Sequence, residues 1–93
     1  MPIEHVPGAQ KADIMLYALS TCGWCRKAKQ HLTDLGLAYR YVFVDQLEGD
    51  ERQKTVAEIT RWNPACSFPT MVIDNARCIV GFNPGELDKI AGK

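Results

Sequence analysis

The feature that most constrains the fold is a strand, an amphipathic helix and a second strand that follow one another between residues 12 and 44. Residues 12–19 form a short apolar run, which is typical of a buried strand. In residues 23–35, apolar side chains recur every three or four positions, which predicts a helix with one buried face. The positions of that face are Cys25, Ala28, Leu32 and Leu35. Residues 37–44 are rich in β-branched and aromatic side chains, so we expect a second strand, parallel to the first.

The second half of the chain predicts a helix, a hairpin and a final helix. The expected elements are a helix over 51–62, strands over 70–74 and 77–80, and a helix that opens at Asn83. The first of these helices ends at Asn63-Pro64, because the residue before a proline avoids helical geometry. Asn83 is a favourable N-cap residue, and Pro84 and Glu86 suit the first turn that follows it.

The resulting order, β-α-β-α-β-β-α, predicts an α/β fold with a four-stranded mixed sheet and three helices that cover both faces. A chain of 93 residues has room for one hydrophobic core, so we expect a single domain over residues 12–93. Residues 1–11 are expected to be a flexible lead-in, because Pro2, Pro7 and Gly8 discourage regular structure.

Charge and hydropathy exclude several classes of function. Eleven Lys and Arg residues balance eleven Asp and Glu residues, which argues against a nucleic-acid partner, because binding to a phosphate backbone needs clustered positive charge. No apolar run approaches the ~20 residues of a membrane span. The first eleven residues lack the basic start and apolar core of a signal peptide. We therefore expect a monomeric cytoplasmic protein without a membrane or nucleic-acid partner.

Four cysteines, at positions 22, 25, 66 and 78, are the main candidates for catalytic or metal-binding residues. In a reducing compartment, a pair at Cys-x-x-Cys spacing, such as Cys22 and Cys25, is typical of a catalytic or a metal-binding site. A zinc site would need Cys66 and Cys78 as further ligands, but the eleven residues between them are poor zinc spacing. We expect no metal site, and we interpret Cys66 and Cys78 as small, partly buried residues.

The position of the pair favours redox chemistry. Cys22 falls at the first turn of the predicted helix, where free N–H groups and the helix dipole favour a thiolate, and Arg26 and Lys27 add positive charge. Cys25 continues the apolar stripe and should be buried, whereas Cys22 should face solvent. This predicts Cys22 as the attacking nucleophile and Cys25 as the resolving thiol. Trp24 is expected to be a surface aromatic that shapes the docking face.

Three segments of the chain resemble the glutaredoxins, a family within the thioredoxin fold. They are Tyr17-Ala-Leu-Ser-Thr-Cys-Gly-Trp-Cys25, Ser67-Phe-Pro-Thr70 and Gly81-Phe-Asn83, and the order of elements agrees over residues 12–92. The resemblance implies that Pro69 is cis and lies against the cysteine pair, and that the Phe68 backbone pairs with a disulfide-linked substrate or glutathione. It also places glutathione near Thr21, Trp24, Gly81, Phe82 and Asn83.

The function that the resemblance implies is that of a thiol-disulfide oxidoreductase acting on protein or glutathione mixed disulfides. No tightly bound cofactor is expected. The electron donor is either glutathione or a flavoenzyme of the thioredoxin-reductase type, and Leu19, where glutathione-using members usually carry lysine, favours the flavoenzyme. The alternative is a carrier of a [2Fe-2S] cluster held by Cys22 and glutathione. Gly23, at a position where proline is usual, makes that alternative sterically plausible, whereas Cys25 favours redox chemistry.

Overall fold

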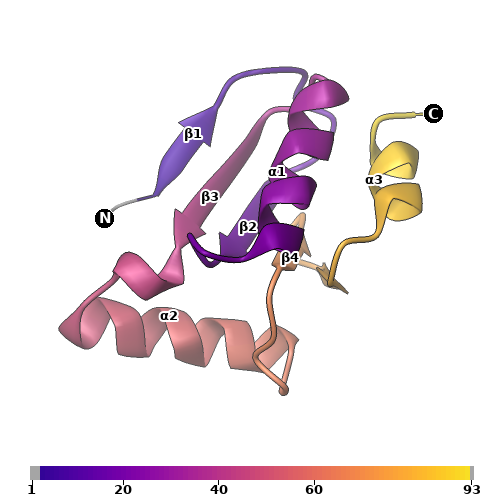
Figure 1. Ribbon diagram of the computed structural model, residues 1–93. Helices are drawn as coiled ribbons and strands as arrows, with labels where there is room; N and C mark the ends of the chain where they lie inside the picture. Colours follow the sequence, from indigo (N-terminus) through magenta and orange to yellow (C-terminus); the bar gives the residue numbers. More distant parts are fainter. Residues whose placement is uncertain (1–2, 93) are drawn as a thin grey trace.

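The computed structural model describes residues 3–92, in which five strands, three α-helices and one short 3-10 helix are found (Figure 1). In chain order they are β1 (Glu4–Val6), β2 (Ile14–Ala18), α1 (Gly23–Asp34), β3 (Tyr39–Phe43), η1 (Val44–Gln46), α2 (Gly49–Trp62), β4 (Thr70–Ile73), β5 (Arg77–Val80) and α3 (Pro84–Ile90). Each predicted strand and helix is present, with ends within two residues of the expected ones. No helix in this part of the chain is both long and apolar enough to span a membrane.

The strands form one mixed sheet in the order β1-β3-β2-β4-β5. The first predicted pairing is confirmed, because β2 and β3 are parallel, with Leu16 opposite Tyr41. The predicted hairpin is confirmed as well, since β4 and β5 are antiparallel. On its other side, β2 pairs with β4 in antiparallel fashion, so that β2 is the central strand. The carboxyl end of this central strand leads directly to Cys22.

The N-terminal segment differs from the prediction, because Glu4–Val6 forms a fifth strand. This strand, β1, pairs with β3 in antiparallel fashion at the edge of the sheet. Pro7 and Gly8 do not prevent it, because they follow the strand instead of interrupting it. Gly8 lies so close to the chain at Gly36 that an added Cβ would be 2.6 Å from the Gly36 carbonyl oxygen. Pro2, which also suggested an irregular lead-in, lies outside the described residues.

The two faces of the sheet carry separate hydrophobic clusters. Alternate residues of β2 point to opposite faces, so Leu16 packs in one cluster and Met15 in the other. Leu32 of α1 and Leu87 of α3 complete the first cluster, and Ile59 of α2 completes the second. Thus α1 and α3 cover one face and α2 covers the other (Figure 1).

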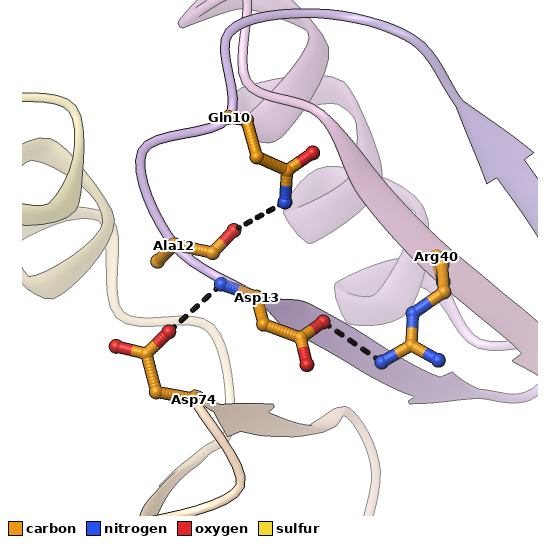
Figure 2. A network of polar contacts seen from close by, with 5 residues as sticks. All are labelled: Gln10, Ala12, Asp13, Arg40 and Asp74. Carbon is orange, nitrogen blue, oxygen red and sulfur yellow. Dashed lines mark hydrogen bonds and ion pairs between the residues drawn. The ribbon is translucent and has the colours of Figure 1, made fainter.

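Polar contacts fix the amino end of β2, opposite the end that leads to the cysteines (Figure 2). The Asp13 N–H donates to Asp74 Oδ1 over 2.8 Å, which ties the start of β2 to the β4–β5 turn. Arg40 of β3 donates to Asp13 Oδ1, also over 2.8 Å, and Gln10 donates to the Ala12 carbonyl over 3.2 Å. The central strand is therefore anchored to both of its neighbours at this end.

Candidate functional site

Cys22 is the N-cap residue of α1 and links the central strand to that helix. Its Sγ accepts a hydrogen bond from the Cys25 N–H over 3.2 Å, and its own N–H donates to the Leu19 carbonyl over 3.2 Å. The first turn of α1 contains no acidic residue, so no carboxylate there offsets the positive end of the helix dipole. This environment stabilises negative charge on a sulfur atom. Cys22 is half-buried, so its side chain is less exposed than the sequence suggested.

Cys25 lies on the buried face of α1, as its place in the apolar stripe predicted, and only 1% of its surface is exposed. Burial, followed by the side-chain hydrogen bond with Cys22, raises the pKa of the Cys25 thiol to about 12. A charge on Cys22 adds to this effect, because two neighbouring negative sulfurs repel each other. Cys25 therefore holds its proton more tightly than an ordinary cysteine does.

The loop before Cys22 is held by Asp45 from η1. The Ser20 N–H donates to Asp45 Oδ1 over 2.9 Å, and the Ser20 hydroxyl donates to Asp45 Oδ2. These two bonds, the hydroxyl first, lower the pKa of the Asp45 carboxyl below its ordinary value. Thr21, between Ser20 and Cys22, is exposed. The sequence alone does not indicate this contact, because Ser20 and Asp45 lie 25 residues apart.

The peptide bond between Phe68 and Pro69 is cis, as the resemblance implied. Pro69 is buried, and its carbonyl accepts a hydrogen bond from the Gly81 N–H over 2.8 Å, which joins the start of β4 to the end of β5. Phe68 is half-buried and packs against the hydrophobic clusters on both faces of the sheet. Cys22 packs against the same α1-side cluster as Phe68. The cysteine loop and the proline loop thus border one core.

Aromatic rings connect α1 with the segment before α3. The Trp24 ring is 59% exposed and lies 6.2 Å from the Phe82 ring, centroid to centroid. The His31 and Phe82 rings form a T-shaped pair with centroids 5.9 Å apart, and His31 Nε2 lies 2.9 Å from Asp88 Oδ1 on α3. No spacing pattern in the sequence indicates the contact between His31 and Asp88. The contact was hidden because Asp88 lies 57 residues further along the chain.

Asn83 occupies the predicted N-cap position of α3. Its Oδ1 accepts a hydrogen bond from the Glu86 N–H over 3.3 Å, so this side-chain oxygen already has a partner inside the protein. Gly81 precedes it with φ +79°, a backbone conformation that favours glycine. The segment 81–83 is thereby held between β5 and α3, with Phe82 turned toward Trp24.

Cys66 and Cys78 lie on the other side of the sheet and pack against the α2-side cluster. Both are half-buried, as expected. The Cys78 thiol donates to the Trp62 carbonyl at the end of α2, over 3.1 Å. Within residues 3–92, no group of three or more His, Cys, Asp or Glu side chains could hold a metal ion, so the four-cysteine zinc site is not formed. The cluster-carrier alternative stays a prediction.

Comparisons with known proteins agree with this arrangement. The family model for glutaredoxin matches residues 14–77. A glutaredoxin-like 8.6 kDa protein in the rubredoxin operon of Clostridium pasteurianum is 34% identical over 80 residues, which are 86% of this chain and 99% of that protein.

Two solved structures are also similar. The glutaredoxin from Methanosarcina mazei Go1 has a TM-score of 0.90 at 44% identity, and the match covers 100% of this chain and 90% of that one. The methanoredoxin of Methanosarcina acetivorans has a TM-score of 0.88 at 42% identity, and the match covers 92% and 90% of the two chains. The predicted thioredoxin-like α/β fold is thereby confirmed, with five strands in place of four.

Proposed function

The chain belongs to the glutaredoxin family, whose general activity is thiol-disulfide oxidoreduction, and from this premise we propose that it reduces protein and glutathione mixed disulfides through Cys22 and Cys25. The observation that carries the proposal is the difference between the two sulfurs. Cys22 Sγ accepts a hydrogen bond from the Cys25 N–H at the amino end of α1. Cys25, in contrast, is only 1% exposed, and the pKa of its thiol is raised to about 12. One sulfur is suited to attack, and the other keeps its proton until it is needed.

In the first step, the Cys22 thiolate attacks one sulfur of a substrate disulfide. A bond forms between Cys22 and that sulfur, the substrate S–S bond breaks, and the other substrate sulfur leaves as a thiolate that takes a proton from water. The product is a mixed disulfide at Cys22. The Cys22 sulfur now carries no charge, so the repulsion that helped to keep Cys25 protonated is removed.

In the second step, Cys25 loses its proton and attacks the Cys22 sulfur. A Cys22–Cys25 disulfide forms, and the second substrate sulfur leaves and is protonated. Two electrons have then passed from the protein to the substrate. Two glutathione molecules, oxidised to their disulfide, or a dithiol flavoenzyme would return them.

For the glutathione contacts we keep the segments that the resemblance identified. The Phe68 backbone would pair with the backbone of the bound glutathione, next to Pro69, and the exposed Thr21 and Trp24 would lie close to it. The segment Gly81–Asn83 would receive the γ-glutamyl end. The Asn83 side-chain oxygen caps α3, so its contact would come from the backbone or the amide nitrogen. A monomeric state and a cytoplasmic location stay predictions.

The test is a coupled assay in which NADPH and glutathione reductase keep glutathione reduced while the protein acts on a mixed disulfide. We expect turnover that Cys22→Ser abolishes and Cys66→Ser, the matched control, leaves unchanged. Cys25→Ser should accumulate a mixed disulfide at Cys22, detectable by mass spectrometry. Full activity of Cys22→Ser contradicts the proposal. If glutathione gives no turnover but a thioredoxin-reductase-type flavoenzyme does, the donor is the flavoenzyme.

A further inference from the structure

Trp24 presents a large ring to solvent beside the reactive cysteine pair. Within residues 3–92, only Trp24 and Val80 are large apolar side chains with an exposed surface, 59% and 50% respectively. An exposed tryptophan leaves apolar surface in water that a binding partner can cover, and tryptophan is enriched at the centres of protein interfaces. Trp24 lies two residues after Cys22, so a molecule that reacts there passes close to the ring.

The ring is held in place by its neighbours. Phe82 lies beside it at 6.2 Å with an angle of 31° between the ring planes, and Lys27 Nζ lies 4.5 Å from the Trp24 centroid. Phe82 in turn forms a T-shaped contact with His31, and His31 is held by Asp88. A ring that is already ordered loses little side-chain entropy when a partner covers it. We call Trp24 and Phe82 together the ring shelf.

A lysine lies beside the ring shelf, with Lys27 Nζ next to Trp24. Lys27 forms no ion pair within the described part of the chain, whereas the Asp88 carboxylate is engaged in a contact with His31. Glu86 is also engaged, by Arg77 and Lys89 at 3.5 Å each. A cation without an ion-pair partner next to an exposed ring favours a partner that carries both an apolar and an acidic side chain.

We propose that the ring shelf makes this protein specific for polypeptide disulfides that carry an apolar side chain and an acidic residue close to the reacting cysteine. In this arrangement, His31 and Asp88 are positioning residues that hold Phe82 against Trp24. Glutathione, γ-Glu-Cys-Gly, has no apolar side chain apart from its cysteine, so it covers less of the apolar ring surface than such a polypeptide does. The inference rests on the proposed dithiol activity and adds to it the class of substrate.

The experiment compares three substrates with the full-length protein. Two are synthetic peptides with an intramolecular disulfide, one with Phe and Glu beside the cysteine and one with Gly and Ser at those positions. The third is the mixed disulfide of glutathione and 2-mercaptoethanol. We expect kcat/KM for the Phe/Glu peptide to exceed that for the Gly/Ser peptide by about tenfold, mainly through KM, because one well-covered ring contributes this much to binding.

The variants separate positioning from folding. Trp24→Ala should remove the preference between the two peptides, and His31→Ala should reduce it. Asp88→Asn, which keeps the Oδ1 acceptor, should retain more of the preference than Asp88→Ala. His5→Ala, an exposed histidine on β1, is the matched control and should change nothing. In a Trp62→Phe background, His31→Ala should lower the fluorescence anisotropy of Trp24, because its neighbour Phe82 is released.

Two results would overturn the inference without affecting the proposed function. One is equal kcat/KM for both peptides in the unmodified protein. The other is an unchanged peptide preference in Trp24→Ala. Absence of turnover with all three substrates, under conditions in which a flavoenzyme donor is also supplied, would instead refute the proposed function itself. The two failures are therefore distinguishable in one series of assays.

Discussion

Cys22 and Cys78 lie at opposite ends of helices, and in the function proposed above this difference separates a reactive sulfur from an inert one. Cys22 is at the amino end of α1, and its Sγ accepts a hydrogen bond from a backbone N–H. Cys78 lies against the carboxyl end of α2, and its thiol donates to the carbonyl of Trp62, the last residue of that helix. The positive helix end favours a charged sulfur, and the negative end favours a protonated one.

The comparison teaches that exposure alone does not identify the nucleophile. Cys22, Cys66 and Cys78 are all half-buried. What differs is the direction of the hydrogen bond and the second sulfur beside it. Cys25 supplies both the N–H that Cys22 accepts and the thiol that can resolve a mixed disulfide. A single thiol that is hydrogen-bonded to a carbonyl oxygen has neither such an N–H donor nor a resolving thiol.

The largest effect that tests this comparison is the rate of alkylation. We compare two variants that each keep a single cysteine, Cys22 or Cys78, with the other three changed to Ser. At pH 7, iodoacetamide should modify Cys22 at least about tenfold faster than Cys78, because thiolate character at a helix amino end controls reactivity. Equal rates in folded protein would contradict the role of the helix ends. Equal rates in urea are the control, since they show that the difference comes from the fold.

The second prediction concerns the coupling within the reactive pair. The pKa of Cys25, about 12 in the reduced protein, should fall in Cys22→Ala, because the hydrogen bond and the charge of Cys22 are both lost. It should stay above the ordinary 9.0, because burial is the largest cause of the shift. Cys22→Ser, which restores a hydrogen-bonding atom without the charge, should give an intermediate value. The measurement is the pH dependence of the ¹³Cβ chemical shift of Cys25, and an unchanged value in Cys22→Ala would show that the pair is not coupled.

The sequence was sufficient for the parts of the molecule that depend on local patterns. The helix face of Cys25, Ala28 and Leu32, the Asn83 cap and the Cys-x-x-Cys pair are all defined by residues within one or two turns of each other. The contacts that orient the site are long-range, and those were missed. Ser20 with Asp45 and His31 with Asp88 join different elements, and no spacing rule indicates such pairs.

The strand β1 was missed for a different reason. Its three residues, Glu4–Val6, are too few to show a periodic pattern, and proline and glycine surround them. The strand forms because β3 offers an unpaired edge, with Val6 opposite Tyr39. An edge strand of this kind is determined by its partner, so a short segment read alone gives no signal.

The smallest effect should come from Asp45, which holds the loop before Cys22 and has no counterpart at Cys78. Because its carboxyl pKa is lowered in the folded protein, it contributes stability that is present above its unfolded pKa, about 3.9, and is lost as pH falls through the folded value. The unfolding free energy of the unmodified protein should therefore fall more between pH 6 and pH 3 than that of Asp45→Asn. The difference should be small, because the carboxylate is exposed and solvent screens it.

Glu48→Gln is the matched control for Asp45→Asn. Glu48 is also an exposed acidic residue between β3 and α2, but its side chain forms no capping hydrogen bond. Urea denaturation at the two pH values gives the comparison. If Asp45→Asn and Glu48→Gln lose stability equally on acidification, the Ser20–Asp45 contact does not hold the cysteine loop. If only Asp45→Asn loses less stability than the unmodified protein and also changes the alkylation rate of Cys22 but not of Cys78, the contact acts on the reactive pair alone.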